Sequence, residues 1–153
     1  MGKLLKQAGA IPYRVADGKV EVLLVTSRDT GRWVIPKGNI DDGMTAGQAA
    51  LQEAWEEAGV SGELASTMPF GFVPYFKILK DGVACATSIE VFALRVRQEE
   101  AKWQEKSQRK RAWFRPNKAA AKVDEPALAA LLLRMEEVYG DATYRQFAFA
   151  VNI

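Results

Sequence analysis

Three glutamates, Glu53, Glu56 and Glu57, lie close together in a chain of 153 residues that contains no histidine. Residues spaced i, i+3 and i+4 share one face of an α-helix, so we expect their carboxylates side by side. No Lys or Arg stands between residues 46 and 58 to balance them. Such a cluster is stabilised by a divalent cation with oxygen ligands, Mg²⁺ or Mn²⁺, and magnesium takes further ligands from substrate phosphates. The alternative is an acidic face that is simply solvated.

The absence of histidine narrows the chemistry further. It excludes Ser-His-Asp and Cys-His catalysis as they are usually built. A bound cation works without histidine, because it activates water and neutralises charge on phosphate oxygens. The acidic cluster therefore indicates phosphate chemistry.

The helix that carries the cluster has recognisable ends. Thr45 followed by Gln48 forms a capping box, and Gly59 is a good C-terminal stop, so we expect a helix over residues 46–58. Its neighbouring face should pack on a sheet through Leu51, Ala54, Trp55 and Ala58.

The remaining chain is richer in strands than in helices. We expect strands over residues 7–14, 19–27, 33–35 and 86–96, a short one within 111–116, extended chain over 62–78, turns at Asp17-Gly18 and Asp81-Gly82, and a helix over 125–140. Strands interrupted by a helix indicate a single domain of the α+β or mixed α/β class.

Composition limits the partners. The net charge of +2 is too small to favour nucleic acid, and no apolar run approaches the roughly 20 residues of a membrane span. A lone cysteine, Cys85, excludes internal disulfides and multi-cysteine zinc sites, and without a signal-peptide pattern we expect the cytoplasm. A small-molecule partner remains, and these patterns leave the oligomeric state open.

The segment 38–60 resembles the signature of the Nudix hydrolases, which reads Gly, five residues, Glu, seven residues, then Arg-Glu-apolar-x-Glu-Glu-x-Gly-apolar. The matching positions are Gly38, Glu53, Ala54, Glu56, Glu57, Gly59 and Val60, whereas Met44 replaces the first Glu and Gln52 replaces the Arg. The stretches "EVLLVTSRDTGRWVIPKG" and "RKRAWF" resemble the diphosphoinositol polyphosphate phosphohydrolase branch, and the similarity spans roughly residues 7–135.

This resemblance implies an α/β/α sandwich around a mixed sheet, over residues 1–140, with a tail at 141–153 that either packs back or stays loose. It implies Mg²⁺- or Mn²⁺-dependent hydrolysis of a phosphoanhydride in a diphosphoinositol polyphosphate, a dinucleoside polyphosphate or another nucleoside diphosphate derivative. The implied metal ligands are Glu53, Glu56, Glu57 and the Gly38 carbonyl. One of these glutamates, or one of the loop acids Glu99, Glu100 and Glu105, would position or deprotonate the water.

Basic residues near strand ends are expected to bind the substrate. These are Arg14, Arg28, Arg32 and Lys37, which as a group beside a metal site would hold phosphates, although each alone is equally a surface charge. The run from 109 to 111 is either a charged edge or a second phosphate-binding element. The stretch "ACATSIE" has no base where the inositol-phosphate branch carries Arg or His, which argues against a highly phosphorylated inositol.

Met44 and Gln52, the two departures from the signature, support an alternative function, a non-catalytic module that binds phosphate anions. A protein-interaction domain is a third reading, which the specific spacing argues against. Both departures are also compatible with a working enzyme. Met44 can pack on Ala49 as a hydrophobic staple, and Gln52 can donate a hydrogen bond to Glu56 or to the loop backbone.

Overall fold

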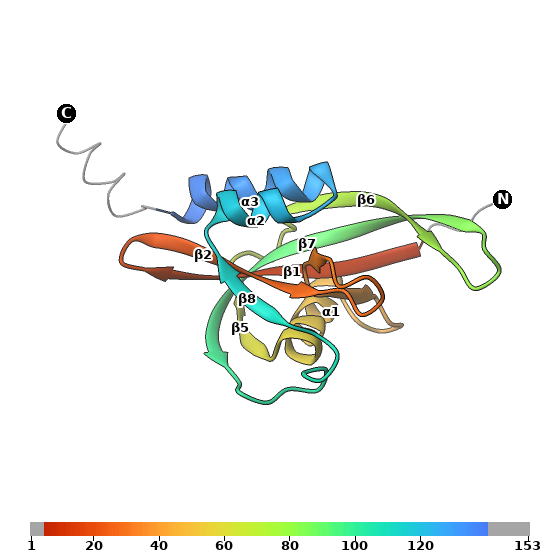
Figure 1. The fold of residues 1–153 in the computed structure, drawn as a ribbon, viewed down its shortest axis with the longest axis horizontal. Helices are drawn as coiled ribbons and strands as arrows, with labels where there is room; N and C mark the ends of the chain where they lie inside the picture. Colours follow the sequence, from red (N-terminus) through yellow and green to blue (C-terminus); the bar gives the residue numbers. More distant parts are fainter. Residues whose placement is uncertain (1–4, 141–153) are drawn as a thin grey trace.

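The computed structural model describes residues 5–140 as an eight-stranded sheet with helices on both faces (Figure 1). The strands are β1 (Leu5–Ala16), β2 (Lys19–Thr26), β3 (Trp33–Val34), β4 (Lys37–Asn39), β5 (Val60–Leu64), β6 (Gly71–Ile78), β7 (Ala84–Glu99) and β8 (Arg111–Phe114). The helices are α1 (Ala46–Glu53), the π-helix η1 (Ala54–Ala58), α2 (Pro116–Lys122) and α3 (Pro126–Tyr139). The expected strands are confirmed, whereas β4 and α2 were not predicted. The expected tail, 141–153, lies outside the described residues.

The two longest strands form the centre of the sheet. The order is β3-β2-β1-β7-β5, with β4 added to β1, β6 to β7 and β8 to β2. β1 and β7 run parallel, and every other pairing is antiparallel. In Figure 1, α2 and α3 cover one face and α1 the other, so the predicted α/β/α arrangement around a mixed sheet is confirmed. Within residues 5–140, no helix is long and apolar enough to cross a membrane.

Each sheet face has its own core. The stripe of α3 that the sequence predicted is buried against one face through Leu128, Leu131, Leu132 and Met135. On the other face the packing residues of α1 and η1 are small, namely Ala49, Ala50, Ala54 and Ala58, each at most 1% exposed. Small side chains let this helix approach the sheet closely, which brings its glutamates near β4. The expectation that Trp55 packs on the sheet is wrong, because it points outward and is 45% exposed.

The helix carrying the glutamates changes type at Ala54. The predicted capping box is present, with Thr45 accepting from the Gln48 backbone and Gln48 accepting from the Thr45 backbone. After Glu53, however, the α-helix becomes the wider π-helix, a form that recurs at functional sites. Gly59 ends it in the left-handed conformation, at a φ of 68°.

We predict that Gly59→Ala destabilises the protein more than Gly43→Ala. Both glycines have positive φ, so each alanine costs about 1–2 kcal/mol. A Cβ on Gly59 would also lie 2.7 Å from Trp103 Cβ, whereas one on Gly43 would meet nothing within 4 Å. Overpacking adds roughly 1–3 kcal/mol. Urea unfolding measures both variants, and equal losses would contradict this account of the turn.

Candidate functional site

Two of the three glutamates converge on the backbone of β4. The Lys37 N–H donates to Glu57 Oε1 at 3.2 Å. A Cβ added to Gly38 would lie 2.4 Å from Glu53 Oε1, so only glycine leaves room for this carboxylate. The carboxyl groups of Glu53 and Glu57 interact, and each influences the pKa of the other; we call them the joined carboxyl groups. The two carboxyl groups therefore share one position beside β4.

Glu56 is engaged by another side chain of the same helix. Gln52 Nε2 donates to Glu56 Oε1 at 3.0 Å, which confirms the hydrogen bond expected for Gln52. The wider π turn favours alignment of Glu53 with Glu57 rather than with Glu56. Met44 is partly buried against the core that contains Ala49, as a staple residue should be. Both departures from the signature thus have a structural role away from the joined carboxyl groups.

An open cleft with about 1350 Å³ of empty space surrounds Glu53 and Glu57. Its charged lining consists of Arg28, Asp29, Arg32, Lys37, Glu53, Glu57, Lys77, Glu105 and Arg109. Among the loop acids expected to handle water, Glu105 lines this cleft. Glu99 instead accepts a hydrogen bond from Trp113 Nε1 at 3.1 Å and forms an ion pair with Arg111 Nε at 3.4 Å.

Arg109 is the cleft residue whose role sequence reasoning left undecided. Its Nη2 lies 3.4 Å from Glu57 Oε2, with both side chains 8% exposed. Its Nε donates to Glu105 Oε1 at 2.9 Å, and its Nη1 donates to the Thr26 carbonyl at 3.0 Å. Glu57 is therefore buried and paired, not solvated. In the sequence, Arg109 stood out only as part of the run "RKRAWF". Its partner Glu57 lies more than fifty residues away along the chain.

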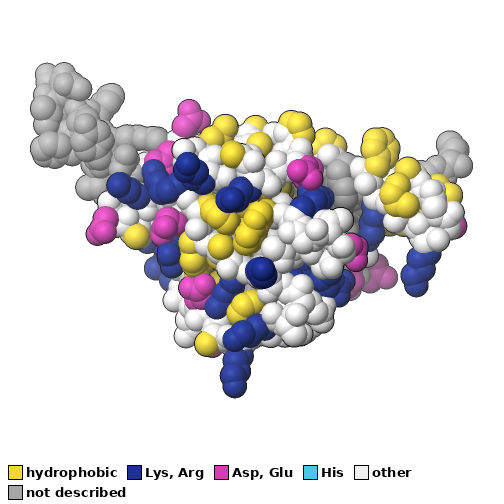
Figure 2. All heavy atoms as spheres, in the orientation of Figure 1, with side chains coloured by type: hydrophobic (Ala, Val, Ile, Leu, Met, Phe, Trp, Pro, Cys, Tyr) yellow, Lys and Arg dark blue, Asp and Glu magenta, His cyan; other side chains and the backbone are white. Residues whose placement is uncertain are grey.

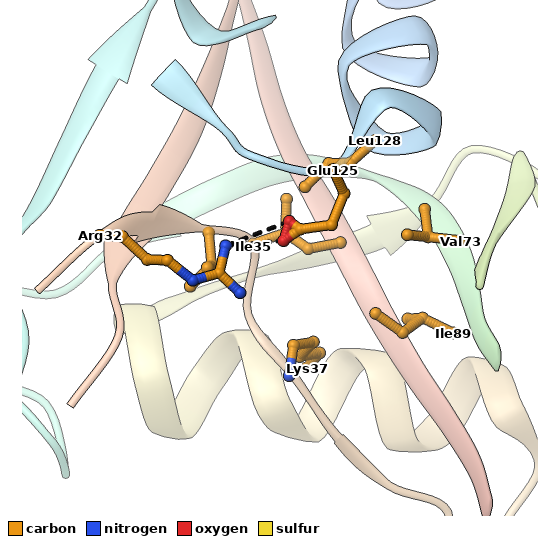
Figure 3. A pocket seen from close by; sticks show the side chains of 8 residues that line it. Arg32, Ile35, Lys37, Val73, Ile89, Glu125 and Leu128 are labelled. Atoms are coloured by element: carbon orange, nitrogen blue, oxygen red, sulfur yellow. Dashed lines mark hydrogen bonds and ion pairs between the residues drawn. The ribbon is translucent and has the colours of Figure 1, made fainter. Parts of the chain in front are cut away.

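The predicted substrate-binding residues divide into two groups. Arg28, Arg32 and Lys37 line the cleft as expected. Arg32 is already engaged, since its Nη1 donates to Glu125 Oε1 at 2.7 Å and Oε2 at 3.1 Å (Figure 3). Arg14 does not reach the cleft, so this prediction is wrong.

The position of Arg14 along β1 explains the error. It lies seven residues beyond the cleft residue Gln7, about 23 Å along the strand. There its Nε donates to Glu21 at 2.9 Å, and its guanidinium lies 4.1 Å from the centre of the Trp113 ring.

Burial controls the charge of the joined carboxyl groups. Desolvation, together with the neighbouring Glu53 and against the opposing effects of Arg109 and the Lys37 N–H, raises the pKa of Glu57 to about 8. Desolvation also raises the pKa of Glu53. At neutral pH the metal-free pair therefore retains a proton, because the protein alone supplies too little positive charge.

Glu53 and Glu57 fit a magnesium-type cation. No group of three Asp, Glu, His or Cys side chains within residues 5–140 is arranged to hold a metal, so Glu53, Glu56 and Glu57 do not form a ready triad. Magnesium needs only one or two carboxylates and completes its shell with water and phosphate oxygens. Two joined carboxyl groups that line an open cleft meet that need.

Comparison with known proteins gives a consistent family. The family model described as NUDIX domain matches residues 4–135. Nudix hydrolase 12, mitochondrial, of Arabidopsis thaliana is 36% identical over 123 residues, or 70% of this chain and 60% of that relative. Diphosphoinositol polyphosphate phosphohydrolase 3-alpha of Homo sapiens is 42% identical over 60 residues, or 39% of this chain and 36% of that protein. This chain thus spans about 60% of the length of the plant relative.

A solved structure extends the likeness to the fold. The binary complex of C. elegans Ap4A hydrolase has a TM-score of 0.65 and 26% identity, covering 87% of this chain and 96% of that chain.

We predict that the stability of the metal-free protein falls from pH 4.5 to 8 because of Glu57. Its pKa is about 8 when folded against 4.5 ordinarily, so the folded state binds the proton more tightly. The resulting stability is complete below pH 4.5 and is lost as pH rises through 8. Across this pH range the free energy of unfolding of the wild type should fall by on the order of 1–4 kcal/mol more than that of Glu57→Gln.

Urea unfolding in EDTA at several pH values measures this difference. Glu63→Gln is the matched control, since Glu63 pairs with Arg97 on the exposed surface and should change stability by less than about 1 kcal/mol. Parallel pH curves for the wild type and Glu57→Gln would contradict the burial of this charge.

Proposed function

The chain belongs to the NUDIX domain family, and from this premise we propose that it is a Mg²⁺- or Mn²⁺-dependent hydrolase of nucleoside diphosphate derivatives or dinucleoside polyphosphates. The family supports cleavage of a pyrophosphate bond in general. The observation that carries the proposal is the joining of Glu53 and Glu57 beside Gly38, inside a cleft lined by basic side chains.

Several charged residues of the site then have a task. Glu53 and Glu57 would hold the cation, and Glu56 would join them if its side chain rotated away from Gln52. When bound, the cation would activate water and neutralise charge on the phosphate oxygens. Arg28 and Lys37 would bind the phosphate groups at the mouth.

In this proposal Glu105 receives the proton of the attacking water. It lines the cleft, and Arg109 fixes its carboxylate beside Glu57. As the water oxygen forms a bond to phosphorus, the anhydride oxygen leaves with its electron pair, and the water proton passes to the carboxylate.

The charge balance favours a nucleotide over a densely phosphorylated inositol. Among residues 5–140, five cations line the cleft against four carboxylates, and carboxylates already engage Arg32 and Arg109. Little positive charge remains for phosphates placed all around an inositol ring. Val34, Ile35 and Ile78 add apolar lining that suits a nucleoside. The Ap4A hydrolase likeness supports the same choice.

Retention of the site argues against a purely anion-binding module. Met44 is accommodated in the core and Gln52 by a hydrogen bond to Glu56, so neither departure disturbs the joined carboxyl groups. An apolar residue and a neutral amide can replace an ion pair at small net cost.

We predict that Glu53→Gln and Glu57→Gln each lower turnover by on the order of 100-fold, because each removes charge that binds the cation. The assay is product mass from a panel of ADP-ribose, Ap4A and inositol pyrophosphate with Mg²⁺ or Mn²⁺. Glu63→Gln should retain full activity, and the wild type should be inactive in EDTA. Full turnover by both site variants would refute the assignment.

We predict that Arg28→Ala and Lys37→Ala raise KM more than they lower kcat. Their side chains would hold the phosphates equally in the ground state and the transition state. Arg14→Ala removes the same kind of charge outside the cleft and should leave KM unchanged. If both cleft variants keep the wild-type KM on the best substrate, the phosphates bind elsewhere.

A further inference from the structure

The β6–β7 hairpin presents an unusually apolar surface to solvent. Phe72, Phe76 and Ile78 are 57%, 71% and 66% exposed. The strand register places these side chains opposite short or polar residues of β7, with Phe76 opposite Ala86 and Ile78 opposite Ala84. We call this surface the hairpin face; it consists of Phe72, Pro74, Phe76, Ile78, Ala84 and Ala86.

The hairpin face lies beyond the helix that covers the rest of this sheet side. Among the described residues, β1 pairs with β7 from Thr87 onward, and residues 76–86 of β6 and β7 pair with each other in a ribbon that projects from the body (Figure 1). Hydrophobic side chains gather at this projecting end (Figure 2). Near its base, Phe92 packs in the core under α1, whereas no helix of residues 5–140 covers β7 from Ala86 to the turn on this side.

The open edge of β6 is blocked, which leaves the face as the docking element. Of the strands that the structure describes, β6 pairs with β7 alone, and Pro74 stands in the middle of its other edge. Proline has no N–H to donate, so a further strand cannot add there with a continuous ladder. The inward side of the ribbon carries Val73, Cys85 and Thr87, which are buried.

We propose that the hairpin face docks on the same face of a second copy of this chain, with the two ribbons antiparallel about a two-fold axis near Phe76. Two-fold contacts are the commonest in homo-oligomers and require a self-complementary surface. With the axis at Phe76, the tip of one ribbon meets the base of the other. Lys80 at the tip then faces Glu90 of the second copy, since Glu90 is the cross-strand neighbour of Phe72.

The exposed area suits a reversible dimer. Phe72, Phe76 and Ile78 with the exposed Pro74, Ala84 and Ala86 present about 500 Å² per copy, or about 1000 Å² for two copies. That total is at the low end for specific interfaces, so the dimer should form and dissociate with protein concentration.

Sedimentation equilibrium of the full chain over a range of concentrations tests the interface. The wild type should shift from monomer to dimer, whereas Phe76→Arg should remain monomeric with an unchanged urea midpoint. Leu133→Arg is the matched control, because Leu133 is 51% exposed on α3 and should leave dimerisation intact. A wild type that is monomeric throughout, or a dimer that survives Phe76→Arg, would overturn the proposal.

A charge swap tests the antiparallel arrangement. Lys80→Glu and Glu90→Lys should each weaken the dimer roughly threefold to tenfold, because each places like charges together across the axis. The double variant restores opposite charges and should regain the wild-type dissociation constant. Additive weakening in the double variant would overturn the arrangement.

Discussion

Burial of Glu57 between β4 and Arg109 is the constraint on which the cleft depends. Glu57 is 6% exposed as a whole residue, so its carboxylate needs partners within the protein. The Lys37 N–H, Arg109 and Glu53 interact with it from three separate segments. Because Glu53 is acidic too, this arrangement leaves a deficit of positive charge. The fold therefore tolerates a locally unfavourable site, whose compensation would come from a bound cation.

Small residues make that burial possible. Ala54 and Ala58 bring the helix against the sheet, and Gly38 leaves the space that Glu53 fills. Gly59 then turns the chain away from the helix, under the Trp103 ring and the Arg111 guanidinium, which stack at 3.9 Å. Arg111 Nη1 donates to the Ala58 carbonyl at 2.7 Å, so the loop that supplies Arg109 is fixed to the end of the same helix.

Local patterns predicted the parts of the molecule that local physics determines. The capping box at Thr45, the stripe on α3 and the turn at Asp17-Gly18 each depend on neighbours in sequence, and all are present. The prediction for Arg14 failed because all strand ends were assumed to lie at the same edge of the sheet, although the far end of β1 lies well away from the cleft. The prediction for Trp55 failed because its apolar side chain was assumed to be buried. The pairing of Arg109 with Glu57 joins positions 52 residues apart, which no local spacing encodes.

Arg109 shows why the signature cannot specify the substrate. It pairs with Glu57, a signature residue, and with Glu105, a residue of the loop before β8. The same loop contributes Gln108, whose side chain accepts from Arg28 at 3.2 Å across the mouth of the cleft. The basic groups open to phosphate are therefore determined by a loop outside the signature. Two chains with the same acidic helix will present different charge patterns to a substrate whenever this loop differs.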